Sequence, residues 1–271
     1  MRDKDAKLVR CVRMAMSKAG QRVLSFYTKE YLITSKNGTS PITEADLDSH
    51  DILTAELKHC LPCPVFSEED ATRQVPEQQR IWLVDPLDGT KDFIAQTGDF
   101  SIMVALIENG KSVAGFVHAP LSKKFYYAVA GQGAFLDDGK TVRRLHVSQE
   151  QDITKQSMFV SRFHRREPEL ALQRDLEIGQ TVTMGSSGLK LCAIAEGCAH
   201  IYLNSSAETG IWDVAAGKVI LEEAGGIVTD MFGSELEFDT KDPFNAKGFL
   251  ASNNVAHGRL IETLARALPR S

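Results

Sequence analysis

Two carboxylates in residues 81–93 have the type and spacing to hold a divalent cation. Asp85 and Asp88 follow the apolar run Ile81–Val84, which predicts a short buried strand. Asp-Pro and Asp-Gly are turn-forming pairs, so we expect a sharp turn between the two acids. Hard cations take oxygen ligands, and two carboxylates with a turn carbonyl provide them. The alternative is an ordinary strand followed by an acidic turn, because turns favour the same residue types.

Other acids also stand at the ends of predicted elements. Glu68 begins an acidic run after a short apolar segment, and Asp213 lies in the first turn of a predicted helix, 210–224. Acidic runs are usually solvated loops, and a first-turn acid can simply favour the helix dipole. Since Glu68 ends one predicted strand and Asp85 ends the next, we propose a divalent-metal site of Glu68, Asp85 and Asp88. Two ions in such a site can hydrolyse a phosphate ester.

Three segments offer groups that bind anions. The segment Gly185–Gly188 opens a predicted helix that carries Lys190, and free amides, hydroxyls and a lysine together suit an anion. The backbone amides of Gly89 and Thr90 are further donors for phosphate oxygens. The basic run 162–166 follows a predicted strand; such runs are usually solvated, but this one could also receive a phosphate.

Periodicity supplies the elements that must position these groups. Apolar stripes predict helices, alternating segments predict an antiparallel meander, and strands interleaved with helices indicate an α/β protein with layered sheets. Thr43 is the expected N-cap of the second helix, with Asp46 as a first-turn acid. Residues 34–41 and 71–80 are predicted loops. The predicted helices cover 4–28, 43–58, 167–176, 185–196, 210–224 and 255–267. The predicted strands cover 64–67, 81–84, 100–108, 112–118, 124–130, 133–136, 158–161, 181–184, 201–203, 227–229 and 249–251.

Composition excludes several classes of protein. The 271 residues are 43% hydrophobic and 25% charged, the balance of a globular protein with a sizeable core. A net charge of -5 argues against a nucleic-acid polymer as partner. No secretory or membrane-spanning run is apparent, so we expect a cytoplasmic protein. The five scattered cysteines predict packing residues rather than a disulfide framework. Cys60 and Cys63 match a CxxC spacing, but a redox or zinc site there lacks the expected context.

Three motifs in order carry a resemblance to a known family: Glu68-Glu69, Asp85-Pro86-Leu87-Asp88-Gly89-Thr90 and Trp212-Asp213-Val214-Ala215-Ala216-Gly217. Together they resemble the motifs of the inositol monophosphatase superfamily, over the chain from the first helix to about residue 254. Within it, Ser40–Asp46, Ser67–Asp70 and Gly89–Phe93, with Gly185-Ser186-Ser187 and Lys190, are most similar to the bacterial-type 3′(2′),5′-bisphosphate nucleotidases.

The resemblance implies a fold and an activity. The fold is an αβαβα five-layer sandwich of the inositol monophosphatase and sugar phosphatase type, in one unit with halves of about 1–155 and 156–271. The activity is Mg²⁺-dependent removal of the 3′-phosphate of adenosine 3′,5′-bisphosphate, giving AMP, with action on the sulfated nucleotide and inhibition by lithium. Roughly two or three Mg²⁺ ions are implied at each site. Dimers are common in the family, although the residues themselves predict no oligomeric state.

The resemblance also implies roles for individual residues. The catalytic residues it implies are Asp46, Thr90 and Glu68. The metal ligands it implies are Glu68, Asp85, the Leu87 carbonyl, Asp88 and Asp213. The substrate-binding residues it implies are Gly89, Thr90, His164, Ser187, Lys190 and Asp213. Asp46 thereby changes from a helix-start acid to a residue that, paired with Thr90, orients and helps to deprotonate the attacking water.

One segment departs from the family pattern. Bisphosphate nucleotidases often carry an arginine shortly before the Trp-Asp motif, whereas residues 202–208 contain no basic residue and include Asn204. A charge-assisted contact to phosphate contributes about 1.5–3 kcal/mol, so its loss could shift substrate preference unless Arg162 or Arg165 substitutes. An inositol or other small-alcohol monophosphatase is therefore the alternative. A binding protein without turnover is disfavoured by the chemically complete site.

Overall fold

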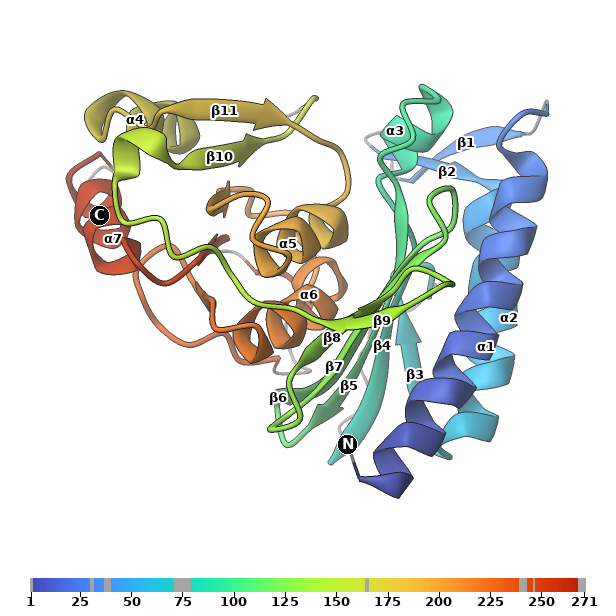
Figure 1. Ribbon diagram of the computed structural model, residues 1–271. Helices are drawn as coiled ribbons and strands as arrows, with labels where there is room; N and C mark the ends of the chain where they lie inside the picture. The colour runs from blue at the N-terminus through green and yellow to red at the C-terminus, as the bar shows by residue number, and fades with distance from the viewer. Residues whose placement is uncertain are drawn as a thin grey trace.

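Helices and sheets alternate in layers, as Figure 1 shows. The structure is a computed structural model that describes residues 2–29, 32–36, 40–70, 79–163, 166–238, 243–245 and 247–267. The helices are α1 (Asp3–Phe26), α2 (Glu44–Cys60), α3 (Thr90–Ile94), α4 (Glu167–Asp175), α5 (Ser187–Ala195), α6 (Trp212–Glu223) and α7 (His257–Ala267), with one 3₁₀ turn, η1 (Ile153–Lys155). None of the helices in these ranges is long and apolar enough to cross a membrane.

A seven-stranded sheet forms the first half of the fold. Its strands are β3 (Val65–Ser67), β4 (Arg80–Asp88), β5 (Ser101–Glu108), β6 (Lys111–Ala119), β7 (Lys124–Val129), β8 (Ala134–Asp137) and β9 (Val142–Arg144), in that order across the sheet. Only the β3–β4 pair is parallel, so the predicted antiparallel meander is confirmed. Side chains alternate between faces. Trp82 and Val84 pack toward α1 and α2, whereas Ile81 and Leu83 join the core formed with α5 and α6.

A five-stranded sheet forms the second half. Its strands are β10 (Ser157–Val160), β11 (Gln180–Thr183), β12 (Ile201–Asn204), β13 (Ile227–Thr229) and β14 (Phe249–Ser252), in the order β11-β10-β12-β14-β13. Helices α5 and α6 lie between the two sheets, and α4 and α7 cover the outer face of this one (Figure 1). The layers are therefore α1/α2, sheet, α5/α6, sheet and α4/α7, which is the expected five-layer arrangement.

Three expectations from the sequence are wrong in detail. The predicted loop at 34–41 contains two short antiparallel strands, β1 (Ile33–Lys36) and β2 (Ser40–Thr43). The predicted turn between Asp85 and Asp88 is absent, because β4 continues to Asp88. Cys11 on α1 and Cys60 at the end of α2 form a disulfide rather than packing as free thiols. The odd cysteine count concealed this pair, since a bond between residues 49 apart depends on the packing of the two helices.

Candidate active site

Three carboxylates meet where β4 ends and α6 begins. Asp85, Asp88 and Asp213 each place one oxygen so that all three atoms lie within 4.8 Å of one another. Asp85 and Asp88 are buried, and Asp213 is half-buried. Clustered anions withdrawn from water need a compensating cation, and oxygen donors at this spacing suit a hard divalent ion. The donor set therefore fits a metal ion.

A β-bulge brings the first two acids to the same side of the sheet. In a regular strand, residues three apart point to opposite faces. Here Asp85 pairs with Met103 and Asp88 with Ser101, so two residues of β4 stand opposite the single residue Ile102. The extra residue restores a common face for both carboxylates. Pro86 fits this position because a bulge does not require its missing N–H.

Asp88 is also bound tightly to the start of α5. Its carboxylate accepts hydrogen bonds from the Ser186 hydroxyl (2.5 Å), the Ser101 hydroxyl (3.2 Å) and the backbone amides of Ser187 (3.0 Å) and Gly188 (2.8 Å). The amides of the predicted anion site at Gly185–Gly188 therefore hold a carboxylate of the protein itself. The Ser187 hydroxyl lies 3.0 Å from the Tyr202 hydroxyl instead.

Asp46 lies beside Thr90 at the start of α2. It accepts hydrogen bonds from the Thr43 amide (2.8 Å) and hydroxyl (2.5 Å). Thr43 is the N-cap of α2, as predicted, and it forms a capping box with Asp46. The Thr90 hydroxyl lies 3.0 Å from an Asp46 oxygen and 3.1 Å from the Leu87 carbonyl, so it can donate to either. Burial raises the pKa of Asp46 to about 6; the Thr43 hydrogen bonds oppose this shift and the charge of Glu68 adds to it.

Gly89 sets the direction of the short helix α3. It is the N-cap, with φ of 90°, and a Cβ atom there would lie 2.8 Å from the Asp99 carbonyl oxygen. Only glycine meets both conditions without strain. The first amides of a helix have no acceptor within it, so the Gly89–Thr90 turn presents donors beside the carboxylate cluster.

One cavity of about 320 Å³ collects nearly all of the predicted site residues. Asp46 lies behind Thr90 rather than in the lining, and His164 lies outside the described residues. Glu68 lines the cavity although it is not part of the three-carboxylate cluster. The predicted residues in the lining are Glu68, Asp85, Leu87, Asp88, Gly89, Thr90, Ser187, Lys190 and Asp213.

Lys190 is a buried cation in the cavity wall. Lys190 is only 3% exposed. Its Nζ lies 3.5 Å from the Tyr202 hydroxyl and 4.5 Å from the centre of the Tyr202 ring. Among the residues that the structure describes, no carboxylate lies within ion-pair distance of it. A buried ammonium with only an aromatic partner favours an anionic ligand in the cavity.

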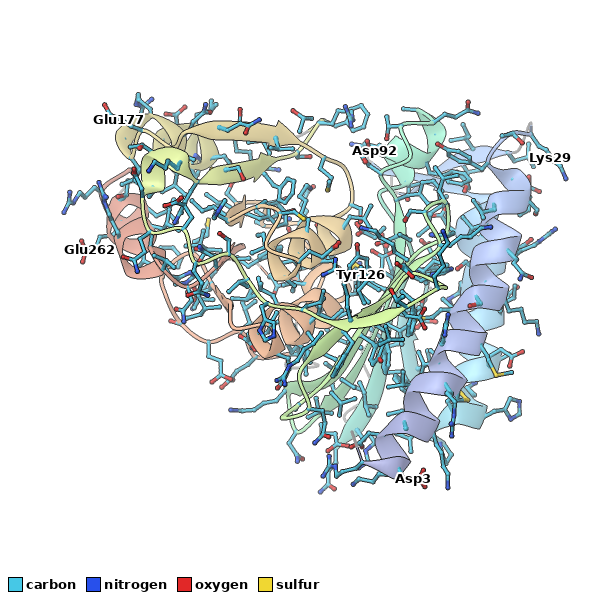
Figure 2. All side chains as sticks on the ribbon, viewed as in Figure 1. Asp3, Lys29, Asp92, Tyr126, Glu177 and Glu262 are labelled. Atoms are coloured by element: carbon cyan, nitrogen blue, oxygen red, sulfur yellow. A yellow bond between two sulfur atoms is a disulfide. The ribbon has the colours of Figure 1, made fainter. Side chains whose placement is uncertain are left out.

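Sequence reasoning missed some of the contacts that support the site. Ser101 donates to Asp88, and no local pattern distinguishes it from other serines; Ser186, expected within an anion-binding segment, donates to Asp88 as well. Arg162, one of two candidates to substitute for the missing arginine, instead pairs with Asp92 (2.9 Å) and Asp99 (2.6 Å). Asp92 lies on the side of α3 that faces the second sheet, as Figure 2 shows. Arg162 is therefore a bridge between the two halves of the fold.

Comparison with known proteins gives the same family by sequence and by structure. A family model described as "Inositol monophosphatase family" matches residues 5–269. The 3′(2′),5′-bisphosphate nucleotidase CysQ of Salmonella typhimurium (strain LT2) is 37% identical over 236 residues, which cover 85% of this chain and 94% of the relative. The CysQ nucleotidase of Escherichia coli (strain K12) is 36% identical over 239 residues, covering 86% and 95%.

Solved structures agree with these matches. The extragenic suppressor protein suhB of Bartonella henselae superposes with a TM-score of 0.82 at 26% identity, covering 96% of this chain and 99% of that one. CysQ from Bacteroides thetaiotaomicron, titled a bacterial member of the inositol monophosphatase family, gives 0.75 at 30% identity, covering 91% and 97%. These matches show a phosphoric monoester hydrolase, and the chain belongs to the inositol monophosphatase family.

Proposed function

We propose that the chain hydrolyses the 3′-phosphate of adenosine 3′,5′-bisphosphate to AMP and orthophosphate, with Mg²⁺ as cofactor. The observation that carries this proposal is that one cavity contains both a carboxylate cluster suited to metal ions and Lys190, a separate buried cation. A substrate with two phosphates supplies one phosphate for the metal ions at the carboxylate cluster and one for Lys190. The name of the CysQ relatives, 3′(2′),5′-bisphosphate nucleotidase, supports a nucleotide with two phosphates as the substrate.

The chain's own residues divide the work of the reaction. Glu68, Asp85 and the Leu87 carbonyl would hold one ion, and Asp85, Asp88 and Asp213 a second. Bound Mg²⁺ lowers the pKa of a water molecule and neutralises charge on the phosphate and the leaving oxygen. The Gly89 and Thr90 amides donate to oxygens of the scissile phosphate, while Ser187 and Lys190 bind the remainder of the nucleotide.

Asp46 and Thr90 act on the proton of the attacking water. The Thr90 hydroxyl donates to Asp46 and accepts a hydrogen bond from the water, which orients the water toward phosphorus. With a pKa of about 6, Asp46 is largely ionised at neutral pH and can receive the proton. As the water oxygen bonds to phosphorus, its proton passes to Thr90 and the Thr90 proton passes to Asp46. The ester P–O bond breaks, and the leaving 3′ oxygen takes up a proton from solvent.

A substrate panel tests this proposal. Phosphate release from adenosine 3′,5′-bisphosphate should be faster than from inositol 1-phosphate, should stop with EDTA and should return with Mg²⁺. Lithium should inhibit it, and the sulfated nucleotide should also be a substrate. Faster release from inositol 1-phosphate would instead favour a small-alcohol monophosphatase. That second candidate draws on Asn204, which lines the cavity in a segment with no basic residue.

A further inference from the structure

Arg166 is a second cation in the cavity wall that lacks an acidic partner. It is the N-cap residue of α4, and it lines the same cavity as Lys190. Its guanidinium Nη2 donates to the Ser206 hydroxyl at 3.3 Å. In the part of the chain that the structure describes, no carboxylate pairs with it. Arg162 differs, because Asp92 and Asp99 occupy its guanidinium.

Helix α4 fixes Arg166 against the segment that follows β12. Glu169, in the first turn of α4, accepts hydrogen bonds from the Ser205 amide (3.1 Å) and hydroxyl (2.8 Å). Glu169 is only 7% exposed, so these hydrogen bonds to Ser205 are shielded from water. The first turn of α4 therefore holds the chain at Ser205, and Arg166, an exposed residue that lines the cavity, contacts the next residue, Ser206.

Both unpaired cations lie along one short stretch of chain. Lys190 packs on Tyr202, and Arg166 donates to Ser206, four residues further on. Tyr202 and Ser206 both line the cavity. Both cations therefore border the same cavity of about 320 Å³, and two positive side chains suit the charge of about −1.5 to −2 on a phosphate monoester.

We propose that Arg166 determines specificity by binding, together with Lys190, the phosphate that is not cleaved. This proposal rests on the function proposed above. Ser206 occupies one of the five guanidinium N–H groups, which leaves enough donors for a two-pronged contact to phosphate. Lysine cannot reproduce that planar fork, so the charge alone should restore only part of the effect.

The test compares two substrates that share the scissile group. Adenosine 3′,5′-bisphosphate and adenosine 3′-monophosphate carry the same 3′-phosphate, but only the first has a remote phosphate. Arg166→Ala should raise KM for the bisphosphate by about tenfold or more, leave kcat within about twofold, and leave KM for the monophosphate unchanged. Arg166→Lys should fall between wild type and Arg166→Ala. Arg174→Ala is the control, because Arg174 lies on the same helix but pairs with Asp175 and Glu167.

Each outcome separates the two proposals. A wild-type protein with no preference for the bisphosphate over the monophosphate overturns the proposed function and the role of Arg166 together. A preference that survives Arg166→Ala overturns only the role of Arg166, as does an equal rise in KM for both substrates. Competitive inhibition by adenosine 5′-monophosphate gives an independent reading, because its inhibition constant should rise in parallel with KM for the bisphosphate.

Discussion

Asp88 performs two tasks with one carboxylate. It binds the start of α5 through two amides and the Ser186 hydroxyl, accepts a further hydrogen bond from Ser101 of β5, and contributes an oxygen to the cluster with Asp85 and Asp213. The donors offset part of the repulsion among the three acids. They also fix the orientation of Asp88, so a metal ligand is held in place by the helix that carries Lys190.

Replacement of Asp88 by asparagine should affect both tasks. Asp88→Asn should abolish most turnover, because a neutral amide is a poor ligand for a hard cation. One of its positions would carry an NH₂ group facing a backbone N–H, so the free energy of unfolding should fall by about 1–3 kcal/mol. Phosphate release and urea unfolding measure the two effects, and circular dichroism should show an intact fold. Activity near that of wild type would refute the assignment.

Asp46 gives a prediction about pH. Its pKa is about 6 in the folded protein, above the 3.8 of an unperturbed aspartate, so the folded state binds this proton more tightly than the unfolded state. The resulting stabilisation is complete below the unfolded pKa and is lost as pH rises through about 6. The unfolding free energy of wild type, relative to Asp46→Asn, should therefore fall by about 1.4 kcal/mol between pH 5 and 8. Urea unfolding in EDTA measures it. A difference that does not vary with pH would show that Asp46 titrates normally.

At the scale of elements, the site depends on where each element begins or ends. The bulge in β4 turns Asp85 and Asp88 to one side, the capping box of α2 holds Asp46, and the first turn of α6 supplies Asp213. Ser49 on α2 donates to the Pro86 carbonyl at 2.8 Å, which ties the bulge to that helix. The position of α2 therefore matters to the chemistry as well as to the core.

The Cys11–Cys60 bond is the covalent restraint on α2. Closing a loop of this length should stabilise the fold by about 2–4 kcal/mol, chiefly by restricting the unfolded chain. Dithiothreitol should lower the unfolding free energy of wild type by that amount and leave Cys60→Ser unaffected. Cys63→Ser should respond like wild type, because Cys63 is a free thiol. Equal stability with and without reductant would show that the bond is absent in solution.

The same bond bears on the predicted cytoplasmic location, because cytosolic proteins seldom retain disulfides. Alkylation of freshly extracted protein tests this by showing whether Cys11 and Cys60 are free thiols in the cell.

At the scale of the whole molecule, local sequence patterns predicted the helices and strands better than they predicted the contacts between residues far apart in the sequence. The helices and the meander follow from periodicity, and the acids of 81–93 were correctly expected to converge, although by a turn instead of a bulge. The amides of α5 were assigned to a phosphate because their actual acceptor, Asp88, lies about 100 residues earlier. The pairing of Asp46 with Thr90 followed from family resemblance alone, since no spacing rule links residues 44 apart.

Arg162 connects the segment after β10 to helix α3, which carries active-site residues, and its removal should show what that connection does. It follows β10 of the second sheet and pairs with Asp92 on α3 and with Asp99 in the segment before β5. Gly185 packs against Asp92 at the same place, and only a residue without a side chain fits there, because a Cβ atom would lie 2.3 Å from the Asp92 carboxyl carbon. Helix α3 begins with the Gly89–Thr90 turn, so this junction sets the position of the amides proposed to hold the scissile phosphate.

Arg162→Ala should leave Asp92 buried without its ion pair and lower the free energy of unfolding by about 1–3 kcal/mol. It should also lower kcat by roughly tenfold, because small displacements of positioning groups are costly. The matched control is Arg22→Ala, which removes an exposed ion pair with Asp48 and should cost less than about 1 kcal/mol with no change in kcat. In the double variant with Asp92→Asn, the two losses should not add, since both remove the same contact. Additive losses, or an unchanged kcat in Arg162→Ala, would mean that the two halves are positioned by their apolar core alone.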